Sequence, residues 1–242
     1  MTSKELQQRL FAVGQRIEGA ATRAGRAPGS VRLLAVSKTF GAEAVAQAVA
    51  AGQRAFGENY VQEGVEKIAE LAAMGSAQGL PGLEWHFIGP LQSNKTRPVA
   101  EHFDWVHSVD RLKIAQRLSE QRPADLAPLQ LLIQVNVDGE ATKSGCAPGE
   151  VLALAQAVAA LPRVQLRGLM CIPDPARPTE QRRAPFKALA ALLAQLNAAG
   201  LAVDTLSMGM SDDLEDAVAE GATIVRVGSA IFGARAPKAP AA

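Results

Sequence analysis

Residues 31–39 read VRLLAVSKT, an apolar run that ends in a lysine and a threonine. Such a run is typical of the first buried strand of an α/β chain, and it places Lys38 at the carboxyl end of that strand. Ligand-binding groups of parallel α/β folds gather at this edge. A lysine held there among apolar neighbours has a lowered pKa and a nucleophilic neutral amine, which favours Schiff-base chemistry. The alternative is that Lys38 extends past the strand end into solvent.

Strand-like segments recur after Lys38 and alternate with segments of helical period. They are predicted at 54–58, 84–89, 104–109, 129–137, 164–172, 204–208 and 223–232. Eight strand–helix units in a chain of 242 residues predict an α/β protein built as a closed (β/α)8 TIM barrel. A doubly wound open sheet is the competing fold, but the Gly-rich turn that is its usual sign does not follow the first strand.

The two ends of the chain differ in character. An amphipathic helix is predicted before the first strand from the apolar positions Leu6, Leu10, Val13, Ile17 and Ala21. Residues 1–233 are therefore expected to form one barrel domain with an extra N-terminal helix. Residues 234–242, rich in Ala and Pro, are expected to be a flexible tail.

Composition narrows the function classes. The formal net charge is +1, from 25 basic and 24 acidic residues, which gives no electrostatic footprint for nucleic acid or a membrane surface. Cys146 and Cys171 lack metal-ligand spacing and only three histidines accompany them, so we expect neither a metal site nor a disulfide. Residues 1–26 mix charge with apolar positions and match neither a signal peptide nor a membrane span, which favours a cytoplasmic protein.

Glycine and serine pairs follow the last two predicted strands. Barrels frequently bind phosphate with the loops after strands seven and eight and the N-terminus of a short helix. The hydroxyl and backbone N–H groups at this corner would come from Ser207, Gly209, Gly228 and Ser229. Ordinary turn geometry is the alternative explanation for the glycines.

Arg226 lies within the apolar segment IVRVG, where an unpaired guanidinium is costly, so it needs a polar partner in the barrel mouth. That partner is either an acidic side chain or a ring nitrogen of a cofactor, which an arginine would keep unprotonated. His86 and His107 are expected to be satisfied core groups, with a supporting role for His86. Met170 is expected to be packing, and Glu58 could equally cap the helix that follows it.

Five motifs between Leu33 and Gly233 closely resemble those of the pyridoxal phosphate homeostasis protein family. They are AVSKT at 35–39, FGENYVQE at 56–63, WHFIGPLQSNK at 85–95, SMGMSDD at 207–213 and VRVGSAIFG at 225–233. The family more often has Gly-Thr where this chain has Gly228-Ser229, which keeps the hydroxyl. Cys171 falls at a variable position, which puts little in doubt.

The resemblance implies a barrel like the N-terminal domain of alanine racemase, a pyridoxal 5′-phosphate (PLP) enzyme of fold type III, with PLP bound through a Schiff base. Motif matching assigns the cofactor contacts residue by residue. It implies Lys38 at the aldehyde, Arg226 at the pyridine nitrogen, Asn59 along the ring, His86 and Met170 near it, and Ser207, Gly209, Gly228 and Ser229 at the phosphate.

The resemblance further implies a role in intracellular PLP homeostasis, by storing, buffering or delivering the cofactor to PLP-dependent apoenzymes. Strong catalysis of its own is not expected, because the tyrosine and second domain that complete alanine racemase have no counterpart; Tyr60 is the one tyrosine. A monomer follows for the same reason. An amino-acid racemase and a Schiff-base aldolase remain alternatives. Lys143, in the loop after the fifth strand, either receives the aldehyde in transit or is a solvated charge.

Overall fold

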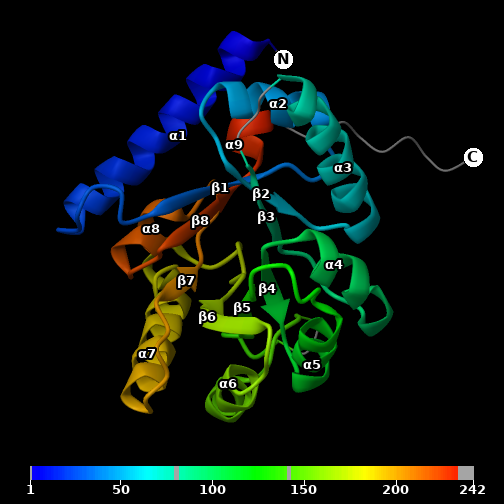
Figure 1. Cartoon of the computed structure of the whole chain (residues 1–242). Helices are drawn as coiled ribbons and strands as arrows, with labels where there is room; N and C mark the ends of the chain where they lie inside the picture. Colours follow the sequence, from blue (N-terminus) through cyan, green and yellow to red (C-terminus); the bar gives the residue numbers. More distant parts are fainter. Residues whose placement is uncertain (1, 79–81, 141–142, 234–242) are drawn as a thin grey trace, which may run out of the picture.

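The computed structural model of the protein describes residues 2–78, 82–140 and 143–233. The predicted tail, 234–242, lies outside the described residues. Within them, eight parallel strands pair in chain order, and β8 also pairs with β1, so the sheet closes into a barrel (Figure 1). The strands are β1 (Arg32–Val36), β2 (Ala55–Glu58), β3 (Glu84–Phe87), β4 (Trp105–Val109), β5 (Leu129–Gln134), β6 (Val164–Met170), β7 (Thr205–Ser207) and β8 (Ile224–Val227). The predicted (β/α)8 barrel is confirmed.

Helices cover the outside of this barrel (Figure 1). They are α1 (Ser3–Arg23), α2 (Ala42–Ala50), α3 (Val61–Gln78), α4 (Thr96–His102), α5 (Leu112–Gln121), α6 (Val151–Ala159), α7 (Ala184–Ala198), α8 (Leu214–Ala219) and α9 (Ser229–Phe232). In this described part of the chain, a helix follows every strand. No helix there is long and apolar enough to cross a membrane.

The N-terminal helix α1 is the element that the sequence analysis placed outside the eight repeats. It begins with a capping box, in which Thr2 Oγ1 accepts from the Glu5 backbone N–H and Glu5 returns a bond to the Thr2 N–H. Its buried face packs against α2, α8 and α9. The helix therefore lies across the junction where the first and last strand–helix units meet (Figure 1).

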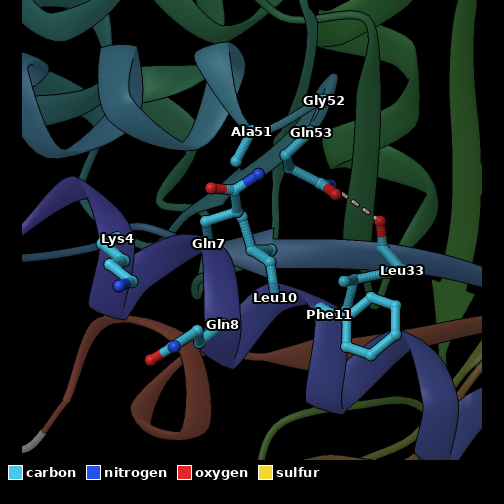
Figure 2. A pocket seen from close by; sticks show the side chains of 9 residues that line it. All are labelled: Lys4, Gln7, Gln8, Leu10, Phe11, Leu33, Ala51, Gly52 and Gln53. Atoms are coloured by element: carbon cyan, nitrogen blue, oxygen red, sulfur yellow. Dashed lines mark hydrogen bonds between the residues drawn. The ribbon is translucent and has the colours of Figure 1, made fainter.

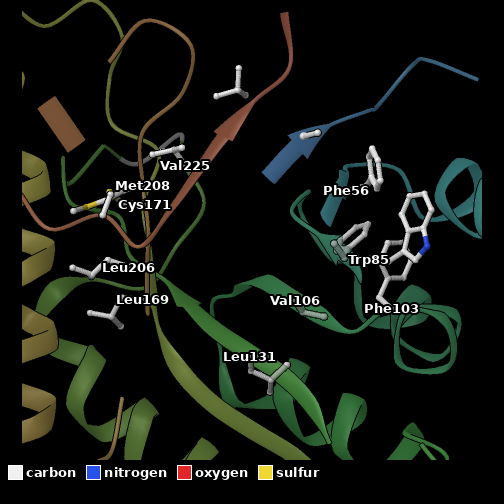
Figure 3. Packing of buried hydrophobic residues seen from close by; sticks show 14 of the residues in the cluster. Phe56, Trp85, Phe103, Val106, Leu131, Leu169, Cys171, Leu206, Met208 and Val225 are labelled. Atoms are coloured by element: carbon white, nitrogen blue, oxygen red, sulfur yellow. The ribbon is translucent and has the colours of Figure 1, made fainter. Parts of the chain in front are cut away.

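The main hydrophobic core fills the layer between the barrel and its helices. Figure 3 shows part of it, with Phe56 and Trp85 on one side and Leu169 and Leu206 on the other. The rings of Phe56 and Trp85 lie 5.6 Å apart. Large buried side chains on the outward faces of the strands thus hold the helices against the barrel.

The inside of the barrel is packed differently. Two small apolar clusters lie apart from the main core, because alternate residues of each strand point inward. One contains Leu34, Val36, Ala55, Ile88 and Ile224, and the other contains Trp105, Leu132 and Met170. Polar side chains, among them two histidines and an arginine, are buried as well.

The structure corrects one predicted element. A continuous strand over 223–232 was expected, but β8 ends at Val227, Gly228 leaves the extended conformation, and Ser229 begins α9. A Cβ at position 228 would lie 3.1 Å from the carbonyl oxygen of Val36. The ends of β8 and β1 therefore approach closely at Gly228, where a larger residue would press on the Val36 backbone. Helix α2, for which the sequence analysis gave no bounds, follows the Lys38 turn directly.

Candidate functional site

A pocket of about 270 Å3 lies at the carboxyl ends of the strands. This is below the roughly 300–1,000 Å3 typical of drug-sized ligands and suits a compact molecule. Its lining comprises Val36, Lys38, Phe40, Asn59, Ile88, Ile172, Met210, Ser211, Asp212, Arg226, Gly228, Ser229 and Gly233. Groups from both ends of the sequence thus meet in one place, as predicted for a barrel of this kind.

Lys38 is half-buried and lies in the turn after β1, two residues past the end of the strand. The turn is held on both sides of the lysine. The Ser37 backbone N–H donates to the Gly57 carbonyl at 3.0 Å, and the Thr39 N–H donates to Glu63 Oε1 at 2.5 Å. Thr39 has a φ of 70°, which is uncommon for a residue other than glycine. The surrounding contacts therefore fix the backbone that carries Lys38.

A buried ion pair supports this turn from below. Lys67 Nζ lies 2.6 Å from Glu58 Oε1 and 3.1 Å from Glu63 Oε1, and it donates to the Ser37 carbonyl oxygen at 2.9 Å. The Ser37 hydroxyl donates to the same Glu58 oxygen at 2.6 Å. Burial raises the pKa of the Glu58 carboxyl, although Lys67 and the Ser37 hydroxyl act to lower it. Glu58 is thus engaged as a buried counter-charge, a role the sequence analysis did not predict.

Arg226 lines the pocket from β8 and is 4% exposed. Its Nη1 donates to Ser207 Oγ at 2.7 Å and its Nη2 donates to the Cys171 carbonyl oxygen at 2.8 Å. Among the described residues no carboxylate forms an ion pair with it. Of the two partners considered from the sequence, the acidic side chain is not found among the described residues, and a hydroxyl and a backbone carbonyl accept from the guanidinium instead. These leave the guanidinium charge uncompensated by a direct contact, and burial lowers the pKa of Arg226.

Two of the residues predicted at the phosphate lie beneath the pocket lining. Ser207 is fully buried, and its hydroxyl contacts Arg226 and lies 2.9 Å from His107 Nδ1. Gly209 has a φ of 92°, and a Cβ there would lie 2.6 Å from the Cβ of Ala217. Gly209 therefore allows the β7 loop to pack against α8, while the loop's later residues reach the pocket.

Hydroxyls from the two last loops do meet at the pocket. Ser211 Oγ and Ser229 Oγ lie 3.3 Å apart, and both residues belong to the lining. Arg16 of α1 donates to the Ser211 carbonyl oxygen at 2.9 Å and pairs with Glu215 at 2.8 Å. The N-terminal helix thus helps to hold the β7 loop in place.

The structure brings five predicted site residues onto the pocket lining: Lys38, Asn59, Arg226, Gly228 and Ser229. It places His86 and Met170 deeper. His86 precedes the lining residue Ile88 by two positions on the inward face, and Met170 packs on Trp105 and Leu132.

Several lining residues were not selected from the sequence. Val36 and Ile88 could have been found from strand alternation, because each lies two residues from a selected position on the same face. Ser211 shares its loop with Ser207 and Gly209, but local pattern alone does not indicate which of these groups turns toward the pocket. Phe40 stacks on Phe232 at 5.1 Å, a contact between distant segments that no local signal reports.

A larger cavity, of about 580 Å3, lies outside the barrel (Figure 2). Residues of α1, Leu33 and the loop after α2 line it, and Gln53 donates across it to the Leu33 carbonyl at 3.0 Å. Its only ionisable lining residue in the described chain is Lys4. This cavity gathers no groups suited to chemistry, so the strand-end pocket is the candidate site.

Two smaller expectations can be compared with the structure. Cys146 and Cys171 are buried free thiols, and burial raises the pKa of the first to about 11 and of the second to about 12. Lys143 Nζ lies 2.8 Å from Asp138 and 3.0 Å from Glu140. Burial acts to lower the pKa of Lys143, but these two carboxylates raise it above its ordinary value. The ammonium form is therefore favoured, which opposes a nucleophilic role. Among the described residues, no cluster of side chains could hold a metal ion.

The closed parallel barrel, with Lys38 after its first strand and Arg226 on its last, is the fold in which the comparisons with known proteins find relatives. The family described as alanine racemase, N-terminal domain, matches residues 10–236. The alanine racemase of Corynebacterium glutamicum shares this fold, with a TM-score of 0.61 and 20% identity over 95% of this chain and 62% of that chain.

Other matches are closer. A pyridoxal phosphate homeostasis protein of Pseudomonas aeruginosa is 62% identical over 97% of both chains. The structure of PipY of Synechococcus elongatus with PLP bound is 40% identical, covers 94% of this chain and 100% of that chain, and superposes with a TM-score of 0.78. This chain belongs to the pyridoxal phosphate homeostasis protein family.

Proposed function

We propose that this protein binds PLP at the strand-end pocket and serves intracellular PLP homeostasis. The observation that carries the proposal is that Lys38, from the turn after the first strand, and Arg226, from the last strand, line one pocket in a chain related to a PLP-bound protein. The neutral amine of Lys38 would condense with the PLP aldehyde, forming a C=N bond and releasing one water.

The pocket's other residues fit such a ligand. Asn59 Oδ1 is buried in the lining and has no hydrogen-bond partner among the described residues, so it is available to a donor on the ring. Arg226 would face the pyridine nitrogen and hold it unprotonated, which weakens the ring as an electron sink. The hydroxyls of Ser211 and Ser229, with the first backbone N–H groups of α9, would receive the phosphate.

The absence of strong catalysis is part of the proposal. Racemisation needs an acid–base group on each face of the substrate α-carbon, and no tyrosine belongs to the described lining of the pocket. Tyr60 is 52% exposed at the start of α3. A cytoplasmic monomer that buffers PLP or delivers it to apoenzymes accounts for these features. The second candidate is an amino-acid racemase, in which Asp212 of the pocket lining would supply the other acid–base group.

The defining experiment adds PLP to the purified protein and follows its visible absorbance. We expect the wild type to show the band of a bound imine, and borohydride reduction to fix the label on Lys38. Lys38→Ala should lose the band, because no other lysine lies in the described lining. Lys187→Ala, on the exposed face of α7, is the control and should retain it.

Either of two results would remove the assignment: no band in the wild type, or an equal band in Lys38→Ala with label spread over surface lysines. Incubation of the loaded protein with D- or L-amino acids then separates the two functions. Rapid loss of optical activity would establish the racemase, whereas transfer of PLP to an apoenzyme without racemisation would support the carrier.

A further inference from the structure

An unbroken series of hydrogen bonds runs through the barrel interior from the pocket. It joins five side chains, which we call the barrel relay: Arg226, Ser207, His107, His86 and Glu84. The distances are 2.7 Å from Arg226 Nη1 to Ser207 Oγ, 2.9 Å from Ser207 Oγ to His107 Nδ1, 2.8 Å from His107 Nε2 to His86 Nδ1, and 2.6 Å from His86 Nε2 to Glu84 Oε1. Strands β8, β7, β4 and β3 each contribute to it.

The direction of the relay follows from its two ends. Burial acts to raise the pKa of Glu84, but the hydrogen bond from His86 and the charge of Arg32 lower it below its ordinary value, so Glu84 is a carboxylate and accepts from His86. A neutral His86 then accepts at Nδ1 from His107 Nε2. His107 in turn accepts at Nδ1 from the Ser207 hydroxyl, whose oxygen accepts from Arg226. Every donor therefore points from the guanidinium toward the carboxylate.

The surroundings of the histidines favour these neutral forms. Both rings are buried, and burial lowers the pKa of each, with His107 well below its ordinary value. The charged groups that face His86 are Glu84, Arg32 and Asp104. Those that face His107 are Arg226 and Arg32, both cationic. A proton added at His86 Nδ1 would reverse the donor of both bonds between His86 and Ser207, and a proton added at His107 Nδ1 would reverse the donor of its bond with Ser207. Either proton would leave the Ser207 hydroxyl hydrogen without its acceptor.

The far end of the relay reaches solvent. The side chain of Glu84 is 34% exposed, and it pairs with Arg32. Both residues line a cavity of about 490 Å3 at the amino-terminal end of the strands. The relay thus connects solvent at one end of the barrel with the ligand pocket at the other.

Stability alone does not explain such a chain. Interiors of barrels of this type are dominated by bulky branched apolar residues. Replacing a buried polar or ionic network by apolar groups of similar volume is often neutral or stabilising. Hydrogen bonds that follow one another in a single direction polarise each other in a low-dielectric interior. The relay therefore links a carboxylate to the buried arginine through hydrogen bonds that polarise one another. The arginine has no direct anionic partner among the described residues.

We propose that the other four members of the relay are positioning residues: Glu84, His86, His107 and Ser207. They orient Arg226 and transmit the electrostatic effect of the Glu84 carboxylate to it through polarised hydrogen bonds. This inference rests on the proposed function, in which Arg226 faces the ring nitrogen of PLP. When Glu84 is ionised, polarisation of the relay lowers the positive electrostatic potential of the Arg226 guanidinium at the pocket. Without that negative charge, more positive potential remains at the pocket and disfavours a protonated form of the bound cofactor.

The test is a pH titration of the visible absorbance of the PLP-loaded protein. Glu84→Gln keeps an oxygen that can accept from His86 but removes the charge. We expect it to shift the titration midpoint to lower pH by about half a unit or more. Asp204→Asn is the matched control, because Asp204 lies at the same end of the barrel and pairs with Arg167 at 2.6 Å, but lies outside the relay. It should leave the midpoint unchanged.

A double-mutant cycle separates an effect transmitted through the hydrogen bonds of the relay from the direct electrostatic effect of the Glu84 charge on the cofactor. Ser207→Ala interrupts the relay next to Arg226 and should itself shift the midpoint. In that background, Glu84→Gln should cause no further shift. Equal shifts from Glu84→Gln and Asp204→Asn, or additive effects of Ser207→Ala and Glu84→Gln, would overturn the relay. A wild type that forms no bound-cofactor band would instead overturn the proposed function, and the relay with it.

Discussion

Replacing Lys67 by methionine is expected to lower the free energy of unfolding by about 3–5 kcal/mol, because it leaves a buried carboxylate without its counter-charge. Glu58 is fully buried and Lys67 is 4% exposed, so water cannot substitute for the lost ammonium group. The same change should weaken PLP binding, on the order of tenfold, because Lys67 holds the Ser37 carbonyl next to Lys38. Denaturant unfolding and PLP titration measure the two effects.

The loss should depend on pH in a defined sense. Burial already raises the pKa of Glu58, and removal of Lys67 removes the larger of the two influences that oppose this rise, the other being the Ser37 hydroxyl. A carboxyl whose folded pKa lies above its unfolded value stabilises the fold below the unfolded pKa and loses that contribution as pH rises through the folded one. The destabilisation by Lys67→Met should therefore be larger near pH 8 than near pH 5, where Glu58 can take up a proton.

Two further variants make this result specific. Lys113→Met makes the same substitution at an exposed position of α5 and should change stability by no more than about 0.5 kcal/mol. Adding Glu58→Gln to Lys67→Met removes the unpaired charge and should recover part of the lost stability. A loss below about 1 kcal/mol, or a double variant no more stable than Lys67→Met alone, would contradict the role assigned to the ion pair.

Gly89→Ala is expected to destabilise the protein by about 2–3 kcal/mol, because the added methyl group has no space. A Cβ at this position would lie 2.1 Å from the Asn59 carbonyl oxygen and 2.8 Å from the Asn59 Cα. The backbone of Asn59 must then move, and Asn59 lines the pocket. We therefore expect weaker PLP binding together with a lower unfolding midpoint.

The control for this substitution is a glycine-to-alanine change that should raise the free energy of unfolding. Gly14 lies inside α1, and nothing lies within 4 Å of a Cβ built there. Gly14→Ala should stabilise the protein by about 0.5–1 kcal/mol, because alanine has the higher helix propensity. If Gly89→Ala unfolds at the wild-type midpoint, the close approach of the two loops is not a constraint on the fold.

The fold was accessible from the sequence because its strands are buried on both faces and read as apolar runs between helical segments. VRLLAVSKT is such a run, and the structure places β1 within it. The error at strand eight arose because Ala230, Ile231 and Phe232 suit a strand as well as a helix turn, so the local sequence does not decide between them. The strand ends where Gly228 lies close to Val36, a residue far away in the sequence.

The site was accessible only in part. Lys38 and Arg226 stand out because a charged side chain in an apolar strand needs an explanation. The partners of these groups come from other strands: Ser207 and Cys171 for Arg226, and Glu63 of α3 for the Lys38 turn. The histidines of the relay were expected to be satisfied core groups, and they are hydrogen-bonded. Their connection into one series depends on the barrel closing, which no segment of sequence encodes alone.

Pairing of β1 with β8 also orders events during synthesis. The pocket draws Lys38 from the start of the chain and Arg226, Gly228 and Ser229 from its last described strand and helix. Lys38 is synthesised early, whereas Arg226, Gly228 and Ser229, which would contact the rest of the ligand, are synthesised much later. A nascent chain therefore exposes Lys38 before the rest of the pocket exists, and the proposed binding of PLP at this pocket would require residues up to Ser229 to be made first.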